Sequence, residues 1–438
     1  MYLSRRLARE LVRLGGTSLG RGLILTGARQ TGKTTLLERE LVPPYELYSF
    51  DEPMAREELL DRPASAWIRR GRSYIFDEVQ KAPEFLGTVK VILDRGEPGR
   101  RVILSGSAQI QLLSGVRETL AGRVVTLELY PLLAGELARS DGPTLLEALV
   151  RCRTAAEATE LLEAARFSDD AAVAVLRDAW DEILRFGGMP RLAALPEPEE
   201  RWRWLREYCT TYLERDVGDL GRIANLDDFL RLQRVAARRT AGLVNFADLA
   251  RDADMAPLTA KRYLRYLELS YQAFLLPAYR RPRRARLAKA PRLHWVDLGI
   301  QRVLSGQREG LTGEQLETAV VAEAFKTLRT AGVEADLMHL RTHDGREIDL
   351  LIRGPRGSYV ALEVKSSRRP APVHARHLRG LEPFLDGPLS AALVVHGGHG
   401  VTSLPGGVFA LPPAVLFGPA PLPSENMAEG VGFEPTEA

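Results

Sequence analysis

The chain has 438 residues, of which 45% are hydrophobic and 27% charged, and its formal net charge is +3. These proportions are typical of a soluble globular protein. No run of about 18 apolar residues is present to span a bilayer, so we expect no membrane segment. The first residues, MYLSRRLARELVRL, lack the apolar core of a signal peptide. With only Cys152 and Cys209, we expect no disulfide framework and a reducing, cytoplasmic setting.

Lysine is scarce among the basic residues. Only seven of the 60 are lysines, and the rest are arginines. Two of the seven, Lys33 and Lys365, fall inside the two segments that carry the strongest chemical motifs. The ammonium of lysine is a compact point charge, whereas the guanidinium of arginine is a planar fork. Lysine at both motif positions therefore favours a chemical role for both residues.

The segment RGLILTGARQTGKTTLLEREL has an apolar strand, Leu23 to Leu25, then G-x-x-x-x-G-K-T, then a helical run. In this context backbone N–H groups curl around phosphates, the helix N-terminus adds positive potential, and Lys33 reaches the outer phosphates. The alternative is a glycine-rich turn before a helix. The expected nucleotide-binding residues are Gly27, Ala28, Arg29, Gln30, Thr31, Gly32, Lys33, Thr34 and Thr35.

The segment SYIFDEVQKAP predicts a strand that ends in Asp77 and Glu78. Asp77, with the hydroxyl of Thr34, would organise Mg²⁺, and Glu78 would orient or deprotonate the attacking water. An adjacent Asp–Glu pair therefore favours hydrolysis over binding alone. The alternative is a strand that ends in a solvated acidic turn.

Three further residues are candidates for the same site. The strand in RRVILSGS ends in Ser105 and Ser107, and either hydroxyl could sense the terminal phosphate. Arg123 lies between an expected helix and an expected strand, as an arginine finger would, acting in its own subunit or toward a neighbour. The alternative for Arg123 is an arginine that interacts with the dipole at a helix C-terminus.

A family resemblance rests on GARQTGKTTLLE, FDEVQKAPEF, LSGSAQIQLLSGVRETLAGRVVTLELYPL, RFGGMPR, YCTTYLERDVGDL and EIDLLI with ALEVKSS. Over residues 1 to about 400 the chain resembles the prokaryotic AAA-superfamily ATPases with a C-terminal domain of unassigned function. The resemblance implies ATP binding and a C-terminal domain similar to restriction-endonuclease folds. It implies no settled biological role.

We therefore predict an α/β protein of several domains. The expected order is an AAA-like P-loop ATPase domain (1–140), a helical connector (141–235), a winged-helix-like segment with a basic linker (236–290), a smaller α/β restriction-endonuclease-like domain (291–400) and a disordered Pro/Gly-rich tail (401–438). The last residues, from about Asn426, resemble a run-on past a natural stop.

The segment from Val244 to Arg280 reads as helix, turn, helix and strand, the order of a winged helix. Its second helix carries Lys261, Arg262 and Arg265, which favours DNA contact; the alternative is a solvated face. The basic run 279–292 could follow a phosphate backbone or serve as a linker.

The segment EIDLLIRGPRGSYVALEVKS predicts two strands of a meander. By alternation Glu347, Asp349, Glu363 and Lys365 share one face, and an upstream helix would bring Glu317 over it. This pattern looks like the core of PD-D/ExK nucleases, in which carboxylates hold Mg²⁺ and the lysine activates water. The alternative is an ordinary hairpin with one polar face. The nearby pairs His374–His377 and His396–His399 have spacings that also suit zinc, without any cysteine to support it.

The sequence thus predicts an ATPase that uses ATP and Mg²⁺ and couples its nucleotide state to a module that binds nucleic acid or protein. Two alternatives stay open: an ATP-gated, metal-dependent nuclease, and a nucleotide-switched DNA-binding module with little turnover. A homo-oligomer is also compatible with the arginine-finger hypothesis.

Overall fold

The computed structural model describes residues 2–41, 45–97, 99–106, 119–168, 170–213, 225–280, 290–342 and 345–421. The fold is mixed α/β, as predicted, and divides into two compact units. Unit 1 comprises Met1–Arg139, Glu182–Leu276 and Ala290–Gly332, and unit 2 comprises Ser140–Asp181, Pro277–Lys289 and Val333–Ala438. In the described residues no helix is both long and apolar enough to cross a membrane.

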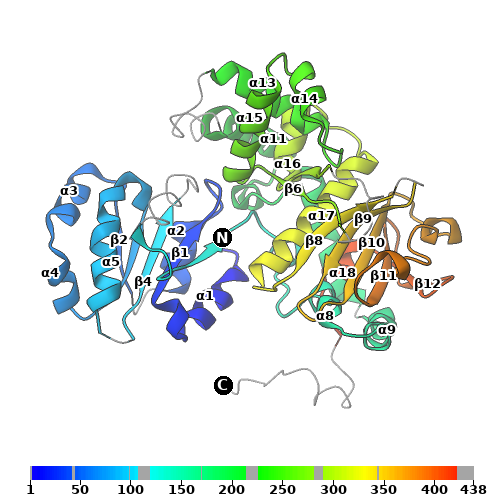
Figure 1. Ribbon diagram of the computed structural model, residues 1–438, viewed down its shortest axis with the longest axis horizontal. Helices are drawn as coiled ribbons and strands as arrows, with labels where there is room; N and C mark the ends of the chain where they lie inside the picture. Colours follow the sequence, from blue (N-terminus) through cyan, green and yellow to red (C-terminus); the bar gives the residue numbers. More distant parts are fainter. Residues whose placement is uncertain are drawn as a thin grey trace. The chain divides into compact units, whose positions relative to one another are not determined.

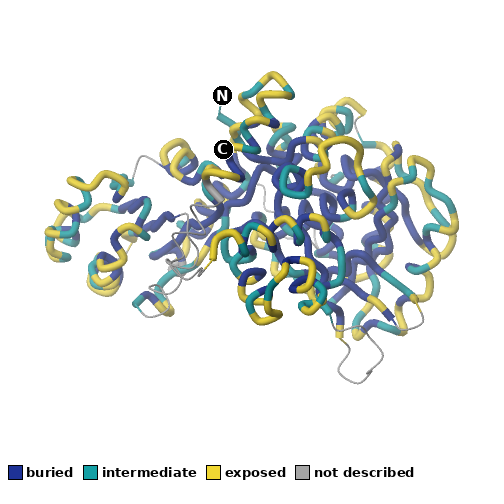
Figure 2. The backbone as a smooth tube through the Cα atoms, turned by 90° about the horizontal axis from the view of Figure 1, so that it is seen from above, coloured by how far each residue is buried: buried dark blue, intermediate teal, exposed yellow. Residues whose placement is uncertain are grey.

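Unit 1 contains a parallel five-stranded sheet (Figure 1). The order is β2 (Tyr45–Ser49), β3 (Ser73–Asp77), β4 (Val102–Gly106), β1 (Gly22–Thr26) and β5 (Val125–Glu128). The strands have apolar residues at consecutive positions because helices cover both faces of a parallel sheet. Every residue of β1 and β4 is buried, the class that Figure 2 draws in dark blue.

Two apolar layers hold the helices against this sheet. Ile24 and Phe76 face one layer, whereas their neighbours Leu25 and Ile75 face the other, as strand alternation requires. The first layer packs on α3 (Pro53–Asp61), α4 (Ala64–Arg69) and α5 (Leu86–Arg95), and the second on α1 (Leu7–Gly15) and α2 (Lys33–Glu40).

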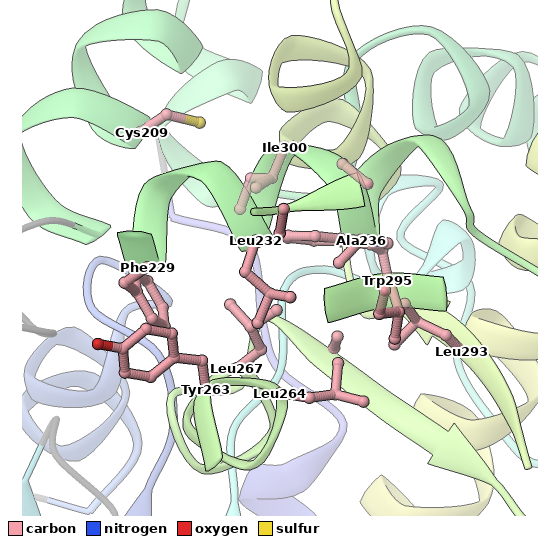
Figure 3. Close-up of a cluster of buried hydrophobic side chains, with 14 of the residues drawn as sticks. Cys209, Phe229, Leu232, Ala236, Tyr263, Leu264, Leu267, Leu293, Trp295 and Ile300 are labelled. Atoms are coloured by element: carbon pink, nitrogen blue, oxygen red, sulfur yellow. The ribbon is translucent and has the colours of Figure 1, made fainter. Parts of the chain in front are cut away.

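A helical region completes unit 1. Its three central helices are followed by a two-stranded antiparallel hairpin, which is the order predicted for a winged helix. Its elements are α11 (Pro198–Tyr208), the π-helical turn η6 (Cys209–Leu213), α13 (Leu226–Arg238), α14 (Phe246–Asp252), α15 (Pro257–Leu269), β6 (Ala273–Leu276), β7 (Arg292–Trp295), α16 (Leu298–Ser305) and α17 (Gly313–Thr330). One core of aromatic and aliphatic side chains, including Phe229, Tyr263 and Trp295, joins the elements from α11 to α16 (Figure 3).

The motif RFGGMPR is explained by a buried cap. Asp297 accepts hydrogen bonds from the N–H of Gly188 (2.7 Å) and from the N–H of Ile300 (3.0 Å), which caps α16. At Gly187, φ is +80° and an added Cβ would lie 2.1 Å from Oδ1 of Asp297. The glycine pair therefore allows the carboxylate and the turn after α10 (Asp170–Phe186) to come into contact.

Unit 2 is built on a six-stranded mixed sheet (Figure 1). Its order is β12 (Thr402–Leu404), β13 (Val408–Leu411), β11 (Leu389–His396), β10 (Tyr359–Lys365), β9 (Glu347–Arg353) and β8 (Asp336–Arg341). The predicted meander is β8, β9 and β10, which pair antiparallel, and β10 and β11 pair parallel. The remaining helices are α7 (Ala134–Leu137) of unit 1 and α8 (Leu145–Arg151), α9 (Ala155–Ala164) and α18 (Pro413–Leu416) of unit 2.

Short 3₁₀ turns connect these elements. They are η1 (Ser18–Arg21), η2 (Val79–Lys81), η3 (Pro83–Phe85), η4 (Ala165–Phe167), η5 (Pro190–Ala194), η7 (Pro372–Ala375) and η8 (Glu382–Phe384).

Three predicted boundaries differ from the structure. The restriction-endonuclease-like domain predicted from residue 291 does not coincide with unit 2, because Ala290–Gly332 belongs to unit 1. The helical connector is not one body, because residues 140–181 pack with unit 2 and residues 182–276 with unit 1. The tail does not begin at residue 401: β13 pairs with β11, and both β13 and α18 are buried. The suspected run-on from Asn426 lies outside the described residues. Both cysteines are free and buried, as expected.

We predict that Asp297→Ala lowers stability by about 3 kcal/mol, because it removes a helix cap and leaves the buried N–H of Gly188 without its acceptor. The matched control is Asn245→Ala, which removes an exposed cap of α14 and should cost about 1 kcal/mol. Thermal unfolding followed by circular dichroism measures both. Equal losses for the two variants would contradict the structural role of Asp297.

Candidate functional site

The glycine loop, Gly27–Gly32, connects the end of β1 to the start of α2. Gly27 has φ of +153°, and an added Cβ would lie 2.2 Å from the carbonyl oxygen of Leu129. Gly32 precedes α2 with φ of +91°, and Gln30 also adopts a left-handed conformation with φ of +59°. The loop therefore needs glycine at the two motif positions, for close approach and for conformation.

Lys33 is the first residue of α2 and is almost fully buried. Its ammonium donates hydrogen bonds to the carbonyl oxygens of Gly27 (3.0 Å) and Ala28 (2.8 Å). The hydroxyl of Thr31 donates to the same carbonyl of Ala28 (2.9 Å). The lysine is thus held over the curled loop, where phosphate oxygens could replace the carbonyls as acceptors.

Thr34 and Asp77 meet at the carboxyl edge of the sheet. The Thr34 hydroxyl donates to Oδ2 of Asp77, which is the last residue of β3, at 2.7 Å. Asp77 is only 3% exposed, and its Oδ1 has no hydrogen-bond partner among the described residues. A hydroxyl and a carboxylate with a spare buried oxygen are hard ligands of the kind that Mg²⁺ prefers, so these residues fit the ion.

Glu78 follows Asp77 directly and has a left-handed backbone, with φ of +55°. This conformation follows the end of β3 at Asp77. The amide of Gln80 donates to the Glu78 carboxylate. A non-glycine residue at positive φ is uncommon and is often found at functional sites, which fits a carboxylate held in place for chemistry.

Of the two serines predicted to sense the terminal phosphate, only Ser105 lies within the described residues. Ser105 lies on β4, which is between β1 and β3, and its register partner is Leu25 of β1. Its hydroxyl is buried and has no hydrogen-bond partner among the described residues. Ser107 lies outside the described residues.

Arg123 lies at the amino ends of the strands of the same sheet, opposite the edge from which the glycine loop begins. It stands two residues before Val125, which pairs with Leu23 at the start of β1. A Cβ added to Gly22 would lie 2.7 Å from the Arg123 carbonyl oxygen, whereas the glycine loop leaves β1 about 13 Å further along. The guanidinium binds both carboxylate oxygens of Asp94 (2.6 and 3.2 Å), and this lowers the pKa of Asp94. The geometry thus argues against an arginine finger in its own subunit, and a role toward a neighbour stays a prediction.

A second polar cluster lies on β9 and β10 of unit 2. The Lys365 ammonium donates to Oε1 of Glu363 at 2.6 Å, and Nδ1 of His377 lies 4.0 Å from the same oxygen. Asp349, on the neighbouring strand, accepts a hydrogen bond from the N–H of Val364 (2.8 Å). Asp349 and Glu363 are almost fully buried, so the structure brings together three of the residues predicted for this face.

Glu347 is associated with the same cluster through its backbone, because its carbonyl lies 3.1 Å from Nδ1 of His377. Burial, together with the neighbouring cations Arg376, Lys365 and Arg346, lowers the pKa of His377 below its ordinary 6.5. The imidazole is therefore neutral at pH 7. In the part of the chain that the structure describes, no group of three or more His, Cys, Asp or Glu side chains could hold a metal ion.

The fifth residue predicted for this face is Glu317. It lies on α17 of unit 1, where Arg292 donates to its carboxylate, and both side chains are largely buried. The helix was predicted correctly, and the carboxylate supplies the counter-charge that a buried arginine on β7 requires. Its place over the polar face of β9 and β10 stays a prediction.

The basic surfaces are only partly described. Lys261, Arg262 and Arg265 are all exposed on α15, opposite its buried face. Arg265 also lies 3.2 Å from Glu268. Most of the basic run 279–292 lies outside the described residues, and Arg292 is engaged with Glu317, so this residue does not offer its charge to a phosphate backbone.

The comparison with known families concerns the first part of unit 1. Residues 20–138 match the model described as AAA domain, so this part of the chain is similar to AAA domains. The matched residues are called the AAA domain below. Residues 177–310 and 312–415 match two models that are each described as a domain of unknown function, DUF8612 and DUF4143. The resemblance to AAA ATPases with a C-terminal domain of unassigned function is confirmed at this level, whereas the likeness to restriction endonucleases stays a prediction.

Two relatives align with most of the chain. They are the "Uncharacterized protein Rv2008c" of Mycobacterium tuberculosis and the "Uncharacterized protein Mb2031c" of Mycobacterium bovis. Each is 26% identical over 396 residues, covering 89% of this chain and 79% of the relative. The similarity therefore extends beyond the AAA domain to both following regions.

A buried ion pair that supports the glycine loop of the AAA domain has no counterpart among the sequence motifs. Arg5 donates to Glu136 (3.1 Å), to the carbonyl of Thr31 (2.7 Å) and to that of Tyr130 (2.6 Å). The arginine is 5% exposed. Arg5 is 26 residues from Thr31 in the sequence, so its contact with the loop is apparent only in the structure.

Proposed function

We propose that the AAA domain binds and hydrolyses ATP and that the regions following it respond to its nucleotide state. The observation that carries the proposal is the Thr34–Asp77 pair, next to Lys33 and Glu78 at one edge of the sheet. In open α/β sheets, ligands bind beyond the carboxyl ends of the strands, and this is where all four residues stand.

Each residue has a defined task in this proposal. Backbone N–H groups of the glycine loop and the N-terminus of α2 bind the phosphates, and Lys33 exchanges its carbonyl acceptors for phosphate oxygens. Glu78 orients the attacking water and accepts its proton. Thr34 and Asp77 would hold Mg²⁺, which when bound offsets the negative charge that develops on the phosphates.

Lys33→Ala is expected to abolish ATP turnover and to weaken ATP binding, because the loop then lacks its cation. The measurement is steady-state phosphate release, with a calorimetric titration of Mg-ATP. The matched control is Lys90→Ala, an exposed lysine on α5 of the same domain. Turnover in Lys33→Ala equal to that of the control would contradict the assignment of the site.

Glu78→Gln should separate binding from hydrolysis. Loss of a positioned general base typically lowers turnover by about 10²- to 10⁴-fold, whereas the affinity for Mg-ATP should stay within about twofold. Glu84→Gln, an exposed residue of the η3 turn, is the control for the change of charge. A parent chain that binds ATP but releases no phosphate would instead favour a nucleotide-switched binding module.

Nucleic acid is the partner that the exposed face of α15 supports best. A helix–turn–helix arrangement followed by a hairpin presents its last helix to the major groove, and Lys261, Arg262 and Arg265 would contact phosphates there. The Lys261→Ala/Arg262→Ala variant should bind duplex DNA more weakly. The slope of log K against the logarithm of the salt concentration should decrease in magnitude by about 1 to 2. The control is Arg231→Ala/Arg234→Ala on α13, and equal effects would favour a protein partner for α15.

A second candidate function is metal-dependent cleavage of nucleic acid, favoured by the contact of Lys365 with Glu363 beside Asp349. If unit 2 is a nuclease, Lys365→Ala should lower Mg²⁺-dependent nicking of supercoiled DNA by at least about 100-fold and leave ATP turnover unchanged. A parent chain that leaves the plasmid intact with Mg²⁺ and ATP would exclude this activity.

A further inference from the structure

The helical region contacts the glycine loop through a tyrosine at the end of α11. The hydroxyl of Tyr208 donates a hydrogen bond to the carbonyl oxygen of Arg29, in the middle of the loop, at 3.0 Å. Tyr208 is 1% exposed, and its ring stacks on Trp204 with centroids 5.2 Å apart. The ring is therefore fixed by packing, and the hydroxyl adds a polar contact that packing alone does not require.

A second tyrosine holds the strand from which the loop begins. The hydroxyl of Tyr271 lies 3.2 Å from Oγ1 of Thr26, the last residue of β1, and 3.4 Å from Oε1 of Glu128 on β5. Burial, with the neighbouring Glu128 carboxylate, raises the pKa of Tyr271 well above its ordinary 10. The hydroxyl therefore stays protonated and can donate at any physiological pH.

The backbone of Tyr271 is held in a strained conformation. Its φ is +60°, which is an outlier for a bulky aromatic side chain. The residue stands two positions after the end of α15 and two positions before the start of β6, so this conformation connects the exposed basic helix to the contact at Thr26. Strain of this kind persists only where the surroundings determine it, and it is common at functional sites.

We propose that Tyr208 and Tyr271 are positioning residues for the nucleotide site, through which the helical region sets the shape of the glycine loop. This rests on the proposed function and adds the means by which the region after the AAA domain regulates it. The two hydroxyls act on residues three positions apart, on either side of Gly27. Neither hydroxyl touches the nucleotide in this scheme.

The physical basis is the geometry of the loop. Phosphate binding needs several consecutive N–H groups to point at one centre, and a peptide unit that turns moves its N–H and C=O together. A hydrogen bond to the Arg29 carbonyl therefore fixes the direction of the next N–H group, that of Gln30, whose φ of +59° is itself unusual. Loss of the bond leaves the loop free to adopt conformations that bind phosphate less well.

The test uses the full chain with Tyr208→Phe, Tyr271→Phe and the double variant, which keep the rings and remove only the hydroxyls. The matched control is Tyr263→Phe: this tyrosine is equally buried in the same region, but its hydroxyl donates to the carbonyl of Asn225, away from the loop. Steady-state kinetics with ATP, calorimetric Kd for Mg-ATP and the unfolding temperature are measured for each.

Each single variant should raise KM and Kd for Mg-ATP by about threefold to tenfold, the effect of one neutral hydrogen bond. The kcat values should change by less than about twofold, since Glu78 and Asp77 are untouched, and the double variant should be weaker than either. All three positions should show similar unfolding temperatures. A merely structural role would instead lower the unfolding temperature and leave KM unchanged.

Affinities of Tyr208→Phe and Tyr271→Phe equal to that of Tyr263→Phe would overturn the inference, even where turnover by the parent confirms the proposed function. A parent that binds Mg-ATP without releasing phosphate contradicts the hydrolysis proposed above, and a weaker Kd in the two variants would then still support the positioning role. A parent that does not bind Mg-ATP would overturn both.

Discussion

The structure of unit 1 depends on the segment 128–136, which runs from the end of β5 past the start of the glycine loop into α7. The N–H of Leu129 donates to the carbonyl of Thr26 at 2.7 Å, and the carbonyl of Leu129 approaches Gly27 too closely for any side chain. The same segment then contacts the helical region, since the N–H of Leu132 donates to Gly188 at 2.6 Å. One stretch of backbone therefore fixes the loop on one side and the following region on the other.

Buried charges secure this segment at two further points. Arg5 pairs with Glu136, and Lys326 pairs with Glu323 on α17 while donating to the carbonyl of Leu132 (3.3 Å). Ion pairs of such low exposure gain little net stability, because desolvation of both charges offsets their attraction. Their value is in specificity: the charges have few other partners, so the N-terminal residues and α17 are bound to one register of the segment. The position of the glycine loop therefore depends on residues that are distant from the motif in sequence.

Local patterns predicted the AAA domain well, because its signals combine within short windows. The strand, the loop and the helix of G-x-x-x-x-G-K-T are contiguous, and Asp77 follows a strand whose burial the apolar run already indicated. Long-range partners carried no such signal. The helix of Glu317 was predicted, yet its partner Arg292 comes from a basic run for which a phosphate-backbone contact and a linker were the two readings. Residues 401–421 looked too rich in Pro and Gly for a core, but parallel pairing with β11 buries β13 inside the edge strand β12.

The contacts within the cluster on β9 and β10 bear on whether these residues could bind a metal ion. One carboxylate oxygen of Asp349 accepts a hydrogen bond from the N–H of Val364. This bond takes the place of a backbone hydrogen bond between β9 and β10. Glu363 shares its charge with Lys365, and the neutral His377 offers no compensation for a second anion. A carboxylate in a hydrogen bond to backbone can also bind a cation with its other oxygen, so the arrangement suits a metal only if a third ligand arrives with the substrate. Phosphate oxygens of a nucleic acid would be such ligands, so the nuclease hypothesis requires metal binding at this cluster to depend on DNA.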